Sequence, residues 1–179
     1  MPKVLISDKM DPKAAEIFRE RGCEVDEITG QTPEELMKII GEYDGLAIRS
    51  STTVTPEILA AATNLKVVGR AGIGVDNVEI PAASAKGVVV MNTPFGNSIT
   101  TAEHAIALMF ALARQLPSAD ASTQAGKWEK SKFMGVELTS KTLGLIGADN
   151  IGSIVAERAI GLRMKVVAYD PFLTEERAV

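Results

Sequence analysis

The segment 142–152 constrains the fold more than any other part of the chain, because a short apolar run leads directly into two spaced glycines. The run 142–146 predicts a buried parallel strand. Gly147 and Gly152 stand at the first and third glycine positions of a Gly-x-Gly-x-x-Gly turn, where they permit the tight turn and the close packing of helix on strand. Asp149 occupies the second position, where glycine lets the backbone approach a pyrophosphate, so its carboxylate opposes another anion.

The residues that follow complete a strand–helix–strand unit. Apolar residues recur at helical spacing over 153–160, and Gly161 is predicted to end that helix. The run 164–170 predicts a second strand that ends in Asp170, about 20 residues beyond the turn, where a carboxylate accepts hydrogen bonds from the ribose hydroxyls of NAD and repels a 2′-phosphate. The pattern predicts a Rossmann βαβ unit that prefers NAD to NADP. The alternative is an ordinary glycine turn in which Asp170 is only a strand-end acid.

Composition excludes several classes of function. A hydrophobic content of 46% is enough for a core, and a net charge of −4 argues against a nucleic-acid-binding protein. The single cysteine and the single histidine exclude a disulfide framework and a metal site built from those residues, so we expect no metal. Because no apolar run approaches roughly 18 residues, we expect a cytoplasmic protein with no membrane partner.

Residues 1–96 alternate short apolar strands with amphipathic helices. This alternation predicts a flavodoxin-like, doubly wound parallel sheet in the α/β class, as one domain that ends near residue 96. A second domain, 97–179, is predicted to hold a helical arm and the first part of a nucleotide-binding domain. The strands of the first domain are predicted over 3–7, 24–28, 45–48, 66–68 and 88–91, and its helices over 12–20, 33–40, 55–62 and 80–85.

Two predicted strand ends are rich in groups that bind anions. Arg49 and Ser50 follow the third strand, and Arg70 and a glycine-rich run, 71–74, follow the fourth. Ligands of doubly wound sheets bind outside the carboxyl ends of the strands. Arginine binds carboxylate and phosphate in a bidentate manner, and successive backbone N–H groups over 71–74 can form an anion-binding nest. The alternative is that both arginines are surface residues whose stems pack on the sheet.

From residue 97 onward the pattern changes. A long helix is predicted over 101–114, with a broad apolar face that suits packing against another helix. The loop 126–138 exposes apolar residues that favour a dimer contact. His104 lies within the long helix, and we interpret it as a structural or interface residue and not as a general base.

Several stretches together resemble the D-isomer-specific 2-hydroxyacid dehydrogenases, and the resemblance covers essentially the whole chain. The Gly-Arg-Ala-Gly run at 69–72 and the Lys-Phe-Met-Gly run at 132–135 are typical of the phosphoglycerate branch of that family. The stretches that carry the resemblance are 49–50, 68–77, 91–94, 96–98, 126–128, 132–135 and the turn at 147–152.

The resemblance implies NAD-dependent oxidation of 3-phospho-D-glycerate to 3-phosphohydroxypyruvate, in L-serine biosynthesis, by a homodimer or a higher homo-oligomer. It also implies that the helix from Thr101 is part of the dimer arm and that Lys130 reaches the site of a neighbouring subunit. The implied substrate-binding residues are Arg49, Ser50, Arg70, Gly72 and Asn97, and the implied cofactor-binding residues are Gly147, Asn150, Ile151, Gly152 and Asp170.

The catalytic residues implied by the resemblance have no match in this sequence. In the family, the catalytic arginine, its supporting acid and the general-base histidine follow the second strand of the nucleotide-binding domain, and His104 does not match that histidine. We therefore expect no turnover from the 179 residues alone. A two-stranded unit over 142–170 leaves open edges, so we expect it to be weakly ordered or completed by another chain, whereas the segment before residue 97 should fold by itself.

Two alternatives remain open. The first is a non-catalytic ligand-binding or dimerisation module. The second is a hydroxypyruvate or glyoxylate reductase, against which the phosphoglycerate-type motifs argue. Because Asp149 adds a charge beside the expected pyrophosphate, we also predict that Asp149→Gly strengthens NAD binding, by roughly 1–3 kcal/mol.

Overall fold

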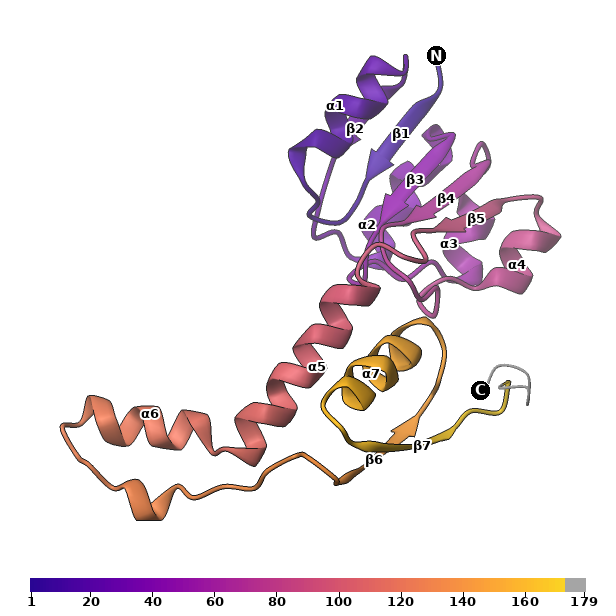
Figure 1. The fold of residues 1–179 in the computed structure, drawn as a ribbon. Helices are drawn as coiled ribbons and strands as arrows, with labels where there is room; N and C mark the ends of the chain where they lie inside the picture. Colours follow the sequence, from indigo (N-terminus) through magenta and orange to yellow (C-terminus); the bar gives the residue numbers. More distant parts are fainter. Residues whose placement is uncertain (173–179) are drawn as a thin grey trace. The chain divides into compact units, whose positions relative to one another are not determined.

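The computed structural model describes residues 1–172 and divides the chain into two compact units (Figure 1). The first unit ends at Gly96 and the second begins at Asn97.

The first unit is built on a parallel sheet of five strands in the order β2-β1-β3-β4-β5. This is the flavodoxin-like order, and it confirms the predicted doubly wound fold. The strands are β1 (Lys3–Ile6), β2 (Glu24–Glu27), β3 (Gly45–Ile48), β4 (Val67–Arg70) and β5 (Val89–Asn92). β4 extends further than predicted, so that Arg70 is its last residue instead of lying beyond it.

Three α-helices of this unit begin where the local sequence supplies a side-chain cap. Thr32 and Glu35 form a capping box, in which each side chain accepts a hydrogen bond from the backbone N–H of the other residue. Asp11 and Thr55 cap two further helices, and proline stands in the first turn of each of the four α-helices. The helices are α1 (Pro12–Glu20), α2 (Pro33–Ile39), α3 (Pro56–Ala61) and α4 (Ile80–Ala85), with a 3₁₀ turn, η1 (Ile40–Glu42).

Both faces of this sheet are packed. Alternate side chains of β3 point to opposite faces, with Leu46 and Ile48 on one face and Ala47 on the other. Leu46 and Ile48 pack into a cluster that includes residues of α2, α3 and α4, whereas Ala47 packs with Ala15 of α1. Every residue of β3 is buried. The loops at the carboxyl ends of the strands therefore rest on a rigid sheet.

The second unit contains α5 (Ser98–Ala113), α6 (Leu116–Gln124), a 3₁₀ turn η2 (Lys130–Lys132), β6 (Thr142–Ile146), α7 (Asn150–Gly161) and β7 (Lys165–Tyr169). β6 and β7 pair in parallel and form a two-stranded sheet. α5 packs against α7, where Ala102 and Ala159 are fully buried. Arg158 of α7 forms an ion pair with Glu103 of α5 at 3.1 Å.

One feature of this unit differs from the sequence-based expectation. α6 was not predicted, although Pro117 in its first turn is a typical start signal; the helix follows Gln115, which has a left-handed backbone with φ of 53°. The expectation that Gly161 ends α7 is confirmed. Gly161 is the last helical residue, and the left-handed residue of the C-terminal turn is Arg163, with φ of 60°. The N–H of Met164 closes that turn by donating to the carbonyl of Ala159.

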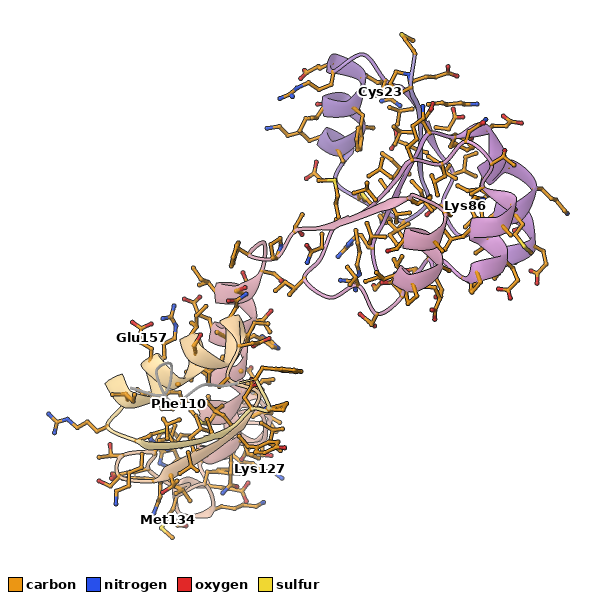
Figure 2. All side chains as sticks on the ribbon, turned by 90° about the vertical axis from the view of Figure 1, so that its right-hand side faces the viewer. Cys23, Lys86, Phe110, Lys127, Met134 and Glu157 are labelled. Atoms are coloured by element: carbon orange, nitrogen blue, oxygen red, sulfur yellow. The ribbon has the colours of Figure 1, made fainter. Side chains whose placement is uncertain are left out.

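Apolar side chains remain exposed in the second unit. Ile146 of β6 is 94% exposed, and Val167 and Tyr169 of β7 are exposed as well. Met134, in the segment after η2, is also exposed, and its side chain projects outward (Figure 2). Across residues 1–172, no helix combines the length and the apolar character that crossing a membrane requires.

Candidate functional site

Asp8 organises the loop that follows β3. It lies directly beyond the carboxyl end of β1 and is only 4% exposed. Its Oδ2 accepts hydrogen bonds from the backbone N–H groups of Arg49 at 2.6 Å and of Ser51 and Thr52 at 3.2 Å. Its Oδ1 accepts a hydrogen bond from the Thr52 hydroxyl at 2.7 Å. One buried carboxylate therefore fixes the backbone of a four-residue loop that begins at Arg49.

The environment of Asp8 favours its charged form. Burial raises the pKa of its carboxyl, but the hydrogen bonds from the Thr52 hydroxyl and from the backbone N–H groups of Arg49, Thr52 and Ser51 outweigh burial, so the pKa lies below its ordinary value. Sequence reasoning gave Asp8 no role. The strand-end rule that selected Arg49 and Arg70 could have found it, because Asp8 follows β1 in the same way.

Asn77 joins this loop to the end of β4. Its Nδ2 donates to the carbonyl oxygens of Arg49 at 2.7 Å and Thr52 at 2.6 Å. Its Oδ1 accepts a hydrogen bond from Nε of Arg70 at 2.8 Å. A single amide side chain thus holds both the loop and the guanidinium in place, a role that the sequence did not assign to it.

The Arg70 side chain is only 13% exposed. Its Nη2 lies 3.9 Å from Oδ1 of Asp76, and its Nη1 lies over the Cα of Gly72. A Cβ at position 72 would contact Nη1, so glycine leaves the space in which the guanidinium rests. The packing of Arg70 therefore explains the second glycine of the Gly-Arg-Ala-Gly run, Gly72.

The structure brings the predicted substrate residues of the first unit to neighbouring strand ends. Ile48, the residue before Arg49, pairs with Arg70 in the sheet. Arg49 and Ser50 are exposed, and Nη1 of Arg49 donates to the carbonyl of Lys9 at 3.3 Å. The fifth predicted substrate residue, Asn97, belongs to the second unit, where it precedes α5 and makes no capping hydrogen bond through its side chain.

The expected anion-binding nest over 71–74 is only partly available. The N–H of Ala71 donates to the carbonyl of Ile48 at 2.8 Å, and the N–H of Gly72 donates to the carbonyl of Arg70 at 3.0 Å. Because these bonds hold the turn itself, the side chains of Arg49 and Arg70 are the main candidates for binding an anion at this edge of the sheet.

The glycine turn of the second unit has a backbone that suits a dinucleotide. Gly147 has φ of 96°, which side-chain-bearing residues rarely adopt. Gly152 is buried, and a Cβ at this position would collide with the carbonyl oxygen of Gly147. Gly147 is thus required by the backbone conformation of the turn after β6, and Gly152 by the close approach of α7 to that turn.

Two carboxylates bind backbone donors of the same turn. Oδ1 of Asp149 accepts hydrogen bonds from the N–H groups of Ile151 at 3.2 Å and Gly152 at 3.5 Å, so Asp149 caps α7. Asp170 accepts hydrogen bonds from the N–H groups of Ala148 at 2.7 Å and Phe172 at 2.8 Å. The backbone frame therefore fits a pyrophosphate, whereas the Asp149 side chain does not, since it places a negative charge on donors that a phosphate would use.

Two residues singled out in the sequence lie elsewhere in the second unit. His104 is exposed on α5, and Lys130 is exposed in η2. Neither residue has a place in the loops described above, so the geometry adds no catalytic role to either.

Comparison with known proteins places these features in a family. Residues 4–178 match the model of the D-isomer specific 2-hydroxyacid dehydrogenase catalytic domain. A D-3-phosphoglycerate dehydrogenase from Archaeoglobus fulgidus is 51% identical over 176 residues, which are 98% of this chain and 33% of the relative. A D-3-phosphoglycerate dehydrogenase from Synechocystis is 48% identical over 178 residues, which are 99% of this chain and 32% of the relative. The chain thus spans about a third of the length of these relatives.

Solved structures agree with this assignment. The NAD⁺-bound 3-phosphoglycerate dehydrogenase of Entamoeba histolytica superposes with a TM-score of 0.78 at 33% identity, covering 98% of this chain and 56% of that one.

Proposed function

Because the chain belongs to the D-isomer-specific 2-hydroxyacid dehydrogenase family, we propose that it takes part in the NAD-dependent oxidation of 3-phospho-D-glycerate to 3-phosphohydroxypyruvate, a step of L-serine biosynthesis. The relatives with about 50% sequence identity are named D-3-phosphoglycerate dehydrogenase, and the chain spans about a third of their length. We propose that the chain makes two contributions. One is the set of groups that bind the substrate, and the other is the first strand–helix–strand unit of the NAD site.

The positioned guanidinium of Arg70 is the observation that carries the proposal. The hydrogen bond that Arg70 donates to Asn77 and the space above Gly72 hold this cation at the carboxyl end of β4, the strand next to the one that Arg49 follows. Phosphoglycerate carries a carboxylate and a phosphate, and two arginines at neighbouring strand ends suit a ligand with two anionic ends. Ser50, Gly72 and Asn97 complete the proposed set.

The cofactor-binding part of the proposal rests on the turn after β6. Gly147 and Gly152 bring the N-terminus of α7 close to the strand, and Asn150 and Ile151 start that helix. We propose NAD and not NADP, because Asp170 at the end of β7 would repel a 2′-phosphate. NAD supplies the acceptor for the hydride that leaves C2 of the substrate.

Calorimetric titration of the chain with 3-phosphoglycerate tests the substrate site. Arg70→Lys removes the planar fork but keeps the charge, and we expect it to weaken binding roughly tenfold. Arg21→Lys, an exposed arginine at the end of α1, is the matched control and should bind as the unmodified chain does. Equal binding by Arg70→Lys, or equal affinity for glycerate without its phosphate, would contradict the proposal.

We also propose that the chain forms a homodimer through α5 and α6. Leu108, Leu112 and Leu116 are each more than half exposed along these helices, and Leu112 is 82% exposed. Sedimentation velocity should show a dimer that Leu112→Lys dissociates. Ile17→Lys, on the exposed part of α1, is the control and should leave the dimer intact. A monomer in the unmodified chain would refute this part of the proposal.

A further inference from the structure

The position of the Asp149 carboxylate bears directly on the proposed cofactor site. Its Oδ1 accepts hydrogen bonds from the backbone N–H groups of Ile151 and Gly152 in the first turn of α7. A helix N-terminus carries partial positive charge and favours an anion at this place. In this chain, the anion at the N-terminus of α7 is the carboxylate of Asp149, a residue of the turn itself.

We propose that Asp149 acts as an internal competitor of the dinucleotide, so that NAD binds only when its pyrophosphate displaces this carboxylate. The inference rests on the proposed function, since it concerns the affinity of the same cofactor site. It makes Asp149 a positioning residue that sets cofactor affinity and not a group that reacts.

The backbone at Asp149 shows that the competition comes from the side chain alone. Its φ of −71° and ψ of −156° are extended values that any residue adopts. Glycine at position 149 would therefore leave the path of the turn unchanged, unlike glycine at position 147, where φ is 96°. A single substitution, Asp149→Gly, would therefore free the N–H groups of Ile151 and Gly152 without changing the fold of the turn.

Two effects of the carboxylate act in the same direction. Its charge repels the pyrophosphate, and its hydrogen bonds engage two N–H groups that the pyrophosphate would use. Asparagine removes the first effect and keeps an acceptor for the second, whereas glycine removes both. The affinity for NADH should therefore rise in the order Asp149, Asp149→Asn, Asp149→Gly.

Titration of the 179-residue chain with NADH, followed by the fluorescence of the nicotinamide, tests this order. We expect Asp149→Gly to lower Kd by roughly tenfold or more, with Asp149→Asn in between. The advantage of both variants should shrink at high salt, because salt screens the repulsion. Asp120→Asn, which neutralises an exposed carboxylate on α6, is the matched control and should leave Kd unchanged.

A second readout is independent of the ligand. Without NADH, Asp149→Gly should melt a few degrees below the unmodified chain because it lacks the capping acceptor, whereas Asp149→Asn should melt close to it. Measurable NADH binding that is equal in all three proteins would overturn the inference and leave the proposed function standing. No NADH binding by any of them would overturn both.

Discussion

Ile48 and Ile146 occupy equivalent places in the two sheets, but the solvent exposure of their side chains is very different. Each ends a parallel strand and precedes a loop that carries proposed binding groups. Ile48 is fully buried, whereas Ile146 is 94% exposed. The same strand–helix–strand pattern therefore produces a closed core in one unit and an open sheet in the other.

The difference lies in the number of neighbours around each strand. β3 pairs with a strand on each side and is covered by helices on both faces. Within residues 1–172, β6 pairs with β7 alone. A parallel strand reads as apolar in sequence because it is normally buried on both faces. The apolar sequence of β6 therefore predicts a buried strand, whereas Ile146 at its end is exposed within the described residues.

The largest expected effect is on unfolding of the first unit. Ile48→Ala leaves a cavity in a packed core and should lower the free energy of unfolding by about 2–5 kcal/mol. Ile146→Ala removes the same atoms from an exposed side chain and should change it by less than about 0.5 kcal/mol. Urea denaturation with hydrogen exchange read separately in each unit measures both. Equal losses would show that Ile146 is covered in solution, for example by another chain.

The next largest effect on stability is expected at Asp8, compared with Asp149, since both carboxylates accept hydrogen bonds from backbone N–H groups. Asp8→Asn replaces a buried acceptor of four hydrogen bonds and forces an amide N–H toward backbone donors, so we expect a loss of about 1–3 kcal/mol. Asp149→Asn, at an exposed carboxylate with two long hydrogen bonds, should cost less than half of that. Thermal unfolding of each variant decides the order, and a costlier Asp149→Asn would contradict it.

Acid should selectively weaken the Asp8 anchor. The pKa of Asp8 is lowered in the folded state, so its stabilising contribution is present above its unfolded pKa and is lost as pH falls through the folded value. The stability gap between the unmodified chain and Asp8→Asn should therefore stay constant near neutrality and shrink below about pH 4. Urea midpoints of both proteins, measured across this pH range, test this prediction. A stability difference that grows as the pH falls would contradict it.

A small effect on stability is also expected at Gly72. A methyl group there would meet Nη1 of Arg70, which can move because it is the end of a flexible side chain. Gly72→Ala should therefore change the unfolding free energy by less than about 1 kcal/mol while weakening phosphoglycerate binding. Calorimetry beside a melting curve separates the two effects. Loss of the fold with no change in affinity would show that Gly72 serves the backbone and not Arg70.

Local signals in the sequence were sufficient for most of the first unit. The pattern of short apolar runs predicts all five strands, and the predicted helix start at Pro33 is confirmed. The convergence of Arg49 and Arg70 also follows from sequence, because carboxyl ends of neighbouring parallel strands meet at one edge.

Long-range hydrogen bonds could not be predicted in the same way. Asp8 binds a loop that lies more than forty positions further along the chain, and Asn77 reaches back to Arg49 and Thr52. Such partners are set by the packing of the sheet and not by spacing in the sequence. The end of α7 at Gly161 was predicted correctly from the local signal, but the left-handed residue of the turn that follows is Arg163, which the sequence did not indicate.

A nuclear magnetic resonance titration of the whole chain with 3-phosphoglycerate, followed residue by residue, tests whether the first unit holds this ligand between Arg49 and Arg70. We expect shifts of the backbone amides of Arg49 and Gly72 and of the side-chain amide of Asn77, with none over 147–152. Unchanged spectra, or shifts confined to the glycine turn, would contradict it.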